Sequence, residues 1–430
     1  MLRKINLRPL NNKTTSKTIF VVFILAMVLS SCYRSDFVMN KSAKDFLGDA
    51  NYPAISYGGY RLESRELQPT IEEIKQDLLI LFAQGFRVIR TYDVHHKFAE
   101  NTLEAIQQLQ NEINDFEMYV MLGAWIDCKD SFTDHPNHDE EDIEGNLREV
   151  NEVVRLANIY PNIVKIIAVG NEAMVHWATS YFVKPSVILK WVNHLQNLKN
   201  TNQLPSDLWI TSSDNFASWG GGDANYHNDD LNKLIKAVDF ISMHTYAFHD
   251  TYYNPSFWNI KSDSSDLDKV EIINKAMIRA VEYEYQQYIS VKNYIYSIDD
   301  SKKIHIGETG WSSVATDLYG SDGTKAADEL KQGIYFNMIT DLCASLSISC
   351  FYFSAFDEPW KDSMNPNGSE NHFGLFTVDG RAKYALWDSV DEGLFKDLKR
   401  PNKIIKTFDG DLNSLMDTVY LPPVNEENGN

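Results

Sequence analysis

The feature that most constrains the fold is a repeating pattern that begins at Pro53, in which a short apolar run is followed by a longer amphipathic stretch. The apolar runs, rich in Val and Ile, cover residues 54–57, 86–91, 118–123, 163–169, 208–212, 240–243, 303–307 and 348–354. Helix-like patterns lie between them, at residues 71–85, 103–114, 147–159, 186–199 and 327–346. Strands that alternate with helices are typical of parallel βαβ units. Eight such strands predict an α/β protein with a closed (β/α)8 barrel, although one misread run would change the count to seven or nine.

The length of 430 residues would suggest two or three domains, but α/β barrels reach this size as one domain. We therefore predict a single barrel domain over residues 51–395. Residues 1–31 are predicted to be an export signal and residues 32–50 a polar tether. Residues 396–430 are predicted to be a C-terminal extension whose last ten residues, 421–430, are disordered.

The first 31 residues have the pattern of a targeting segment rather than of a fold. A basic stretch leads into the apolar run Ile19–Leu29, which is too short to span a bilayer as a mature helix. The run closes on Leu29-Ser30-Ser31-Cys32, which resembles the lipobox of bacterial lipoproteins, where the cysteine is acylated and becomes the new N-terminus. The sequence therefore predicts an exported protein anchored by lipid at Cys32, with the outer membrane as the expected location. An ordinary signal peptide with an incidental cysteine remains the alternative.

The charge of the chain argues against nucleic acid as a partner. The formal net charge is −20, and such a surface repels phosphate backbones and anionic membranes. It is compatible with a neutral substrate, and equally with simple solubility. The only membrane contact predicted is the N-terminal lipid anchor, and the protein is expected to be a monomer.

Neither the cysteines nor the histidines have the spacing of a metal site. Three cysteines follow Cys32, and we expect buried free thiols, although Cys343 and Cys350 could pair. The histidines considered as ligands are expected to be solvated loop residues: His95, His96, His135, His138 and His244. No metal and no cofactor is predicted.

Two carboxylates follow predicted strands, where polar residues are most informative. The fourth strand ends in Ala168-Val-Gly-Asn171-Glu172, and the seventh in Gly307-Glu308-Thr-Gly-Trp311. Cleavage of a glycosidic bond needs one carboxylic acid to protonate the leaving oxygen and a second carboxylate to attack or to activate water. A lone glutamate after a strand is more often an ion-pair or helix-start residue. Two at one barrel mouth favour catalysis.

These two motifs resemble the clan of retaining glycosidases with catalytic glutamates on strands four and seven, and within it glycoside hydrolase family 17, the β-1,3-glucanases. Further segments are similar to that family: residues 86–93, Phe356-Asp-Glu358-Pro-Trp-Lys361 and residues 370–376. The likeness covers residues 54–390. The first strand departs from it, because it reads Ser56-Tyr-Gly-Gly-Tyr60 where the plant enzymes have Gly-x-x-Tyr-Gly.

The resemblance implies roles for eight residues. Glu172 would be the acid/base and Glu308 the nucleophile, and the residues implied in substrate binding are Asn171, Tyr246, Trp311, Glu358, Lys361 and Glu370. Tyr246 would donate to the nucleophile, and Trp311 would be a platform for a sugar ring. A nucleophile must be ionised, so we expect donors around Glu308. An acid must keep its proton, so we expect Glu172 to be less solvated or near another negative charge.

Aromatic residues near the barrel mouth are candidates for stacking on sugar rings. They are Trp125, Trp219, Tyr252, Tyr253, Trp258 and Trp360. Several lie in two long connections, residues 214–230 and 247–266, which follow strands and so belong to the face where barrel enzymes build their sites. For any one of these aromatic residues, core packing is the more common role.

The sequence thus predicts a retaining endo-β-1,3-glucanase that hydrolyses a β-glucan such as laminarin. One alternative is a β-1,3-glucan glucanosyltransferase, which would use the same two glutamates. A second alternative is a surface glycan-binding lipoprotein, which would need aromatic residues but not both glutamates.

Overall fold

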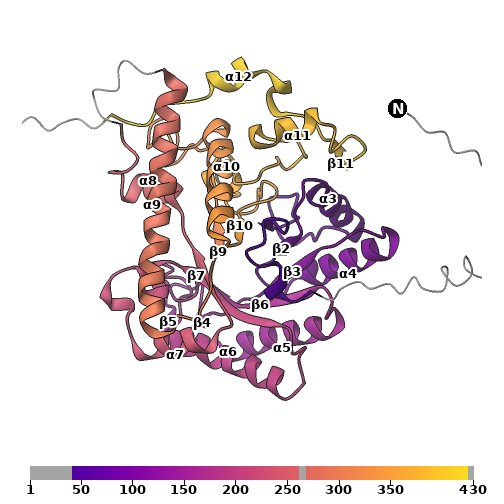
Figure 1. Cartoon of the computed structure of the whole chain (residues 1–430), viewed down its shortest axis with the longest axis vertical. Helices are drawn as coiled ribbons and strands as arrows, with labels where there is room; N and C mark the ends of the chain where they lie inside the picture. Colours follow the sequence, from indigo (N-terminus) through magenta and orange to yellow (C-terminus); the bar gives the residue numbers. More distant parts are fainter. Residues whose placement is uncertain (1–40, 261–267, 425–430) are drawn as a thin grey trace, which may run out of the picture. The chain divides into compact units, whose positions relative to one another are not determined.

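A computed structural model describes residues 41–260 and 268–424 of the chain (Figure 1). The chain divides into two units, Met1–Lys41 and Ser42–Asn430, and the second unit contains the fold. The predicted lipidation site, Cys32, and the whole export signal lie outside the described residues. Within residues 41–260 and 268–424, no helix combines the length and the apolar character needed to cross a membrane.

Eight parallel strands close into a barrel, which confirms the predicted fold class. They are β1 (Ala54–Ser56), β2 (Val88–Arg90), β3 (Tyr119–Ala124), β6 (Val164–Asn171), β7 (Trp209–Asn215), β8 (Ile241–His244), β9 (Ile304–Thr309) and β10 (Cys350–Tyr352). Each strand pairs with the next in this order, and β10 pairs with β1 to complete the ring. Ile55 of β1 shows the closure directly, because it pairs with Ile89 on one side and with Tyr352 on the other.

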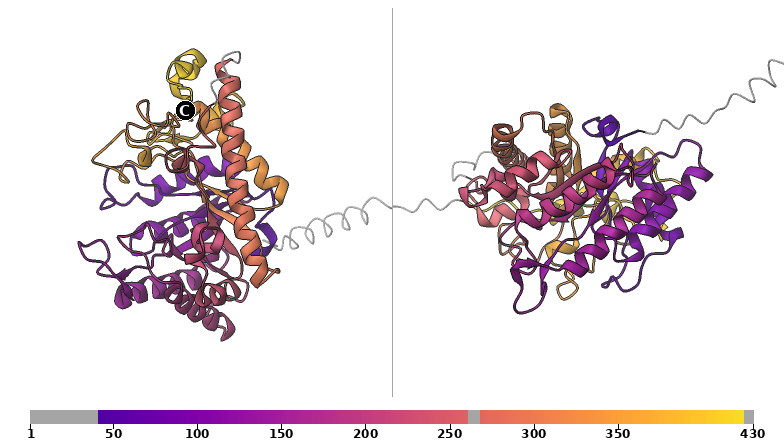
Figure 2. Two further views of the ribbon diagram at one scale, coloured as in Figure 1. Left: turned by 90° about the vertical axis from the view of Figure 1, so that its left-hand side faces the viewer. Right: turned by 90° about the horizontal axis from the view of Figure 1, so that it is seen from below.

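Helices surround the barrel and bury one face each against it (Figures 1 and 2). The longer ones are α3 (Ile71–Ala83), α4 (Lys97–Glu112), α5 (Ile143–Ile159), α6 (Pro185–Asn200), α7 (Asp229–Ala237), α9 (Lys269–Ile298) and α10 (Glu329–Leu346). The sequence pattern predicted five of these and did not predict α7 or α9. In α9, the longest, Asp268 caps the N-terminus, and Glu284 and Gln287 are buried together with its apolar residues.

Shorter elements connect the strands and shape the barrel mouth. A hairpin of β4 (Cys128–Lys129) and β5 (Asn137–Glu141) follows β3, and the short helix α8 (Ala247–Tyr253) follows β8. The remaining turns are η1 (Ala217–Gly221), η2 (Ala224–Tyr226), η4 (Ser369–Asn371), η5 (Tyr384–Leu386) and α11 (Trp387–Asp391). The cysteines after Cys32, at positions 128, 343 and 350, are buried free thiols, as expected.

The predicted tether is wrong for the residues that follow Lys41. A short helix, α2 (Ala43–Phe46), buries Ala43 and Phe46, and the ring of Phe46 stacks on that of Tyr119 in β3 at a centroid distance of 4.9 Å. These side chains belong to the cluster that fills the barrel interior, together with residues of β1, β2, β6 and β10. The folded domain therefore begins at Ser42 rather than at residue 51.

The C-terminal extension is folded up to residue 424, so the predicted disorder of residues 421–424 is also wrong. The extension contains β11 (Lys399–Arg400), β12 (Asn402–Lys403), η6 (Thr407–Gly410) and α12 (Leu412–Asp417), which lies beside α10 (Figure 1). The amide of Ile260 donates to the carbonyl of Pro423 at 2.9 Å. Residues 425–430 lie outside the described part of the chain.

A buried ion pair ties this extension to the start of the barrel. The Arg400 guanidinium donates to Asp77 Oδ1 of α3 at 2.8 Å, and both side chains are fully buried. Asp77 also accepts from Tyr57, which follows β1, at 3.1 Å, and from Arg61 at 2.7 Å. The first βα unit and the C-terminal hairpin thus share one carboxylate.

Candidate active site

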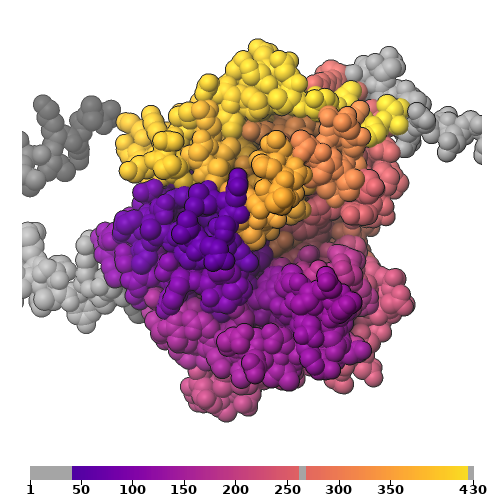
Figure 3. All heavy atoms as spheres, turned by 180° about the vertical axis from the view of Figure 1, so that it is seen from behind, coloured from indigo at the N-terminus to yellow at the C-terminus, as the bar shows by residue number. Residues whose placement is uncertain are grey.

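The C-terminal ends of the barrel strands open into a cleft of about 1600 Å³. Figure 3 shows the molecule hollowed where the indigo, magenta and orange segments meet. Seven of the eight predicted catalytic and substrate-binding residues line this cleft: Glu172, Glu308, Asn171, Tyr246, Glu358, Lys361 and Glu370. The structure thus brings together side chains that lie up to 199 positions apart in the chain, as Asn171 and Glu370 do.

Glu172 leaves β6 through an unusual backbone turn. Gly170 has a φ of +80°, and Glu172 itself has a φ of +47°, in the left-handed region. A Cβ at position 170 would lie 2.9 Å from the Ala173 side chain and 3.0 Å from Ile188, so only glycine fits this turn. The Glu172 amide donates to the carbonyl of Ser213 in β7 at 3.0 Å, which fixes the turn at the rim of the barrel.

Glu308 lies near the end of β9 with three donors around its carboxylate. Oε2 accepts from Arg90 Nη1 at 2.9 Å and from the Tyr92 hydroxyl at 2.7 Å. Oε1 accepts from the Tyr246 hydroxyl at 2.7 Å, as predicted for that tyrosine. Burial acts to raise the pKa of Glu308, but the electrostatic interactions with His244 and Arg90 outweigh it and lower the pKa to about 2. The carboxylate is therefore ionised, which a nucleophile requires.

Arg90 and His244 connect the two glutamates through a chain of close polar contacts. His244 Nδ1 lies 3.2 Å from Glu172 Oε1, and its Nε2 lies 3.1 Å from Arg90 Nη1. Arg90 Nη2 donates to Asn171 Oδ1 at 2.6 Å, so the amide nitrogen of Asn171 is the group that can donate to a ligand. His244 is fully buried, which corrects the expectation of a solvated loop histidine.

Glu172 is the more solvated of the two glutamates, contrary to one of the two expectations. Its side chain is 26% exposed, against 11% for Glu308. The other expectation, a nearby negative charge, agrees with the position of Asp214 at the end of β7. Burial, and to a smaller extent the charge of Glu172, raise the pKa of Asp214 to about 6.

Glu358, Lys361 and Glu370 form a second polar group in the cleft, the polar wall. Burial raises the pKa of Glu358 to about 7, although the charge of Lys361 opposes it. Glu370 Oε1 lies 3.3 Å from His249 Nε2. A Cβ at Gly58, just after β1, would lie 1.9 Å from Glu358 Oε1, so this glycine makes room for the carboxyl. The wall can offer both donors and acceptors to sugar hydroxyls.

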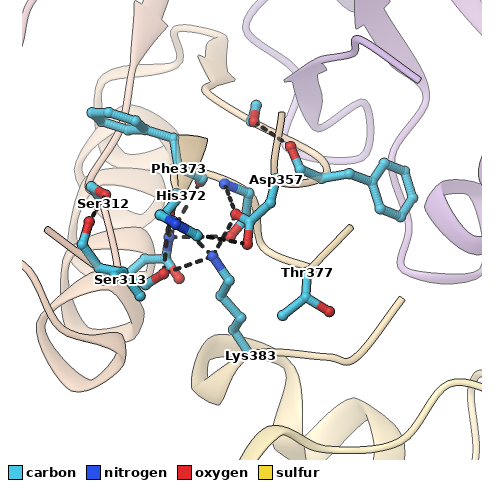
Figure 4. Close-up of polar contacts among 12 residues, drawn as sticks. Ser312, Ser313, Asp357, His372, Phe373, Thr377 and Lys383 are labelled. Carbon is cyan, nitrogen blue, oxygen red and sulfur yellow. Dashed lines mark hydrogen bonds and ion pairs between the residues drawn. The ribbon is translucent and has the colours of Figure 1, made fainter. Parts of the chain in front are cut away.

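A buried lysine holds the segments that carry this wall (Figure 4). Lys383 Nζ donates to Asp357 Oδ1 at 2.6 Å, to Ser313 Oγ at 2.7 Å and to the His372 carbonyl at 3.1 Å. The amide of Gly374 donates to the same oxygen of Asp357 at 3.0 Å. One cation thus fixes the loop after β9 relative to the segments that contain Glu358 and Glu370.

Trp311 does not line the cleft, so its predicted role as a sugar platform is wrong. It is fully buried, its indole N–H donates to the Ala326 carbonyl at 2.8 Å, and its ring contacts Tyr335 of α10. Trp219 and Trp258 are also fully buried, with indole N–H groups bonded to backbone carbonyls. These three rings are core residues.

Among the other aromatic candidates, three line the cleft, namely Trp125, Tyr253 and Trp360. Tyr252 is exposed but lies outside the cleft lining. Sequence reasoning missed Trp177, which is 58% exposed in the cleft, and the rings of Phe132 and Tyr181, which lie beside Trp125. Phe132 and Tyr181 stack on each other at a centroid distance of 5.4 Å.

In the described part of the chain, one group of side chains has ligand atoms close enough for a metal ion, namely Asp93, His95 and His96 at the cleft edge. Their atoms already form ion pairs. His96 Nδ1 lies 3.1 Å from Asp93 Oδ1, and His95 Nδ1 lies 2.7 Å from Glu149 Oε1. Arg65 donates to the other oxygen of Asp93 at 2.8 Å. The group is explained as an ion-pair network, and the chemistry of two carboxylates needs no metal.

Comparison with known proteins identifies what this architecture is similar to. A family model described as the BtgE/BtgC glycoside hydrolase domain matches residues 54–374. The crystal structure of an endo-laminarinase from Formosa Hel1_33_131 is 56% identical, with a TM-score of 0.89 over 90% of this chain and 99% of that one.

Two curated fungal proteins are more distant relatives. A glucan 1,3-beta-glucosidase from Arthroderma benhamiae is 24% identical over 62% of this chain and 70% of its own length. A putative glucan endo-1,3-beta-glucosidase, btgC, from Aspergillus niger is 24% identical over 74% of this chain. The match spans only 40% of the btgC protein.

Proposed function

The chain belongs to the BtgE/BtgC glycoside hydrolase family, and from this premise we propose that it is an endo-β-1,3-glucanase that hydrolyses laminarin-type glucans. The predicted resemblance to a β-1,3-glucanase family is thereby confirmed, and the protein is a glycosidase. The endo-laminarinase with 56% identity over almost its whole length supports the substrate and the mode of cleavage.

One observation carries the proposed mechanism. Glu308 is ionised and held by three donors, and it shares a cleft with Glu172, which is tied to it through His244 and Arg90. In this proposal Glu308 attacks the anomeric carbon while Glu172 protonates the leaving oxygen. Glu172 then removes a proton from the water that releases the sugar, so the anomeric configuration is retained.

The cleft supports the assignment of the other residues. The Asn171 amide nitrogen, beside Glu172, is suited to the sugar 2-hydroxyl, and Tyr246 orients the Glu308 carboxylate. Glu358 and Lys361 of the polar wall offer hydrogen bonds to the sugar. The aromatic rings along the cleft offer apolar faces for further glucose units, as a long polymeric substrate requires.

Product analysis tests the proposal. Proton NMR of early laminarin digestion should show the β-anomer first, and chromatography should show a range of oligosaccharides from the start. An α-anomer as the first product contradicts the two-glutamate mechanism. Early release of glucose alone contradicts endo cleavage, and products longer than the substrate indicate glucanosyl transfer instead.

Two variants separate the roles of the glutamates. Glu308→Ala should abolish cleavage of all substrates, and azide should restore a product of inverted configuration. Glu172→Ala should lose about 10²–10⁴-fold on laminarin but far less on aryl glucosides whose leaving groups need no proton. Equal losses on both substrate types for Glu172→Ala contradict its role as the acid.

We also propose that the protein is exported and anchored to the cell envelope through an acylated Cys32. The support comes from the sequence alone, where a basic stretch and the apolar run Ile19–Leu29 precede Leu29-Ser30-Ser31-Cys32. An anchor of this kind would hold the catalytic domain beside an extracellular or periplasmic polysaccharide.

A further inference from the structure

Glu284 in α9 reaches the back of the barrel mouth, behind Glu308. Its side chain is 2% exposed, although it carries a carboxyl group. Oε1 accepts from the Ala247 amide at 2.7 Å and from Thr309 Oγ1 at 3.3 Å. Oε2 lies 2.6 Å from the Tyr335 hydroxyl of α10. The Tyr335 hydroxyl also bonds to Thr309 Oγ1, so the network is closed.

The two strand ends that Glu284 contacts carry a catalytic pair. Ala247 directly follows Tyr246, and Thr309 directly follows Glu308. The Tyr246 hydroxyl donates to Glu308 Oε1 at 2.7 Å, which links the same two strand ends on the cleft side. The buried Glu284 side chain therefore holds the two strand ends at the separation that the hydrogen bond between Tyr246 and Glu308 requires.

A second residue of α9 reinforces the same connection. Gln287, one helical turn after Glu284, accepts a hydrogen bond from Thr245 Oγ1. The amide of Thr245 donates to the carbonyl of Glu308 at 3.1 Å. Gln287 Nε2 donates to Asp250, which lines the cleft, at 3.1 Å. The buried polar face of α9 thus contacts the segment 245–250 at three points.

We propose that Glu284 is a positioning residue that sets the alignment of Tyr246 with the nucleophile Glu308. This proposal rests on the proposed function, because it takes Glu308 to be the nucleophile. Glu284 does not touch the cleft and acts only through Ala247 and Thr309.

The pKa of Glu284 indicates whether the ionised or the neutral carboxyl group holds the two strand ends. Burial raises the pKa of Glu284 to about 8, although its hydrogen bonds with Ala247, Tyr335 and Thr309 oppose the rise. At neutral pH the group is therefore mostly a neutral carboxylic acid, which can both accept and donate. In this form Oε2–H can donate to the Tyr335 hydroxyl, which then donates to Thr309 Oγ1. The amide nitrogen of glutamine can donate to Tyr335 in the same way, so Glu284→Gln should preserve the network.

Steady-state kinetics on laminarin test the proposal with three variants. Glu284→Ala should lower kcat by about 10–100-fold, since a displacement of about 1 Å costs up to that much, while KM changes little because no sugar contact is lost. Glu284→Gln should keep kcat within about threefold of the wild type, because the amide can make the same hydrogen bonds as the neutral carboxyl group. Ser290→Ala is the matched control, since Ser290 in the same helix donates to the Gly221 carbonyl at 2.9 Å, away from both glutamates. It should leave kcat unchanged.

Two outcomes overturn the proposal: a kcat for Glu284→Ala equal to that of the wild type, or equal losses for Glu284→Ala and Glu284→Gln. Should Glu284→Ala fail to fold, Thr309→Val removes the hydrogen bonds of Thr309 Oγ1 to Glu284 and to Tyr335, beside Glu308, and should lower kcat in the same way. An unchanged kcat in that variant also overturns the proposal. A wild type inactive on laminarin contradicts the proposed substrate instead, and the same variants are then compared on the β-glucan that the wild type cleaves.

Discussion

Replacing Glu284 by glutamine should change how the stability of the protein depends on pH. In the folded protein, burial raises the pKa of this carboxyl from 4.5 to about 8. In the unfolded chain the group is solvated and titrates near 4.5. A pKa that is higher in the folded state contributes stability that is fully present below pH 4.5 and is lost as the pH rises to about 8.

The size of the effect follows from the shift. Each unit of pKa difference corresponds to about 1.4 kcal/mol, so the wild type should lose about 3 kcal/mol through Glu284 between pH 5 and pH 7.5. Glutamine has no proton to lose. The free energy of unfolding of Glu284→Gln, relative to the wild type, should therefore rise by about 1.2 kcal/mol per pH unit on average across this window.

Urea denaturation followed by tryptophan fluorescence at several pH values between 5 and 8 measures this difference. Ser290→Ala should run parallel to the wild type, because the hydrogen bond that it removes does not titrate. A difference between Glu284→Gln and wild type that stays constant with pH would refute the reasoning. So would a difference that shrinks as the pH rises, since that has the opposite sign.

Three further predictions concern other parts of the molecule. Arg90→Met should raise the pKa of Glu308 from about 2, and the acidic limb of the kcat/KM profile should move to higher pH by at least about one unit; an unmoved limb contradicts the role of Arg90. Trp311→Phe should lower the free energy of unfolding by about 1–3 kcal/mol with KM unchanged. Trp360→Ala, in the cleft lining, should raise KM for laminarin severalfold. A raised KM for Trp311→Phe together with an unchanged KM for Trp360→Ala contradicts the placement of these two tryptophans. Cys32→Ala should shift the enzyme from the membrane to the soluble fraction at unchanged kcat/KM, and equal partitioning of variant and wild type contradicts the anchor.

The barrel and its two glutamates could be predicted from the sequence because both depend on local patterns. The eight strands are apolar runs buried on both faces, and Glu172 and Glu308 follow such runs in short motifs. Arg90 and His244 could not be assigned in the same way. They belong to strands, and their convergence on Glu308 depends on the register between β2, β8 and β9, which no single segment encodes.

The failure at Trp311 has a simple geometric cause. Successive residues at the end of a strand point to opposite sides, so Glu308 faces the cleft while Thr309 faces α9 and α10. Trp311 has the same parity as Thr309 and packs on the same side, against Tyr335. A motif that contains both Glu308 and Trp311 predicts that the two residues lie near the barrel mouth, but it does not predict where each side chain points. The pairing register shifts on both sides of these residues, so alternation counted along β9 does not predict the direction of Trp311.

The two chain ends were predicted poorly because composition dominated those predictions. Residues 42–50 include three charged side chains, but Phe46 and Leu47 among them are buried, and these two side chains decide where the segment lies. Residues 396–424 also look polar, yet Arg400 is fully buried. A few buried side chains are enough to fold such a segment, and an average over its residues conceals them.

The shared carboxylate of Asp77 has a consequence for how the chain matures during synthesis. Asp77 is made early, with α3, but its partner Arg400 follows 323 residues later. A nascent chain that stops short of position 400 can pair the Asp77 carboxylate with Arg61 alone, so this buried group still lacks its second counterion. The first βα unit therefore lacks part of its support until Arg400 has been synthesised. Translation must be nearly complete before the ring of strands reaches its final stability.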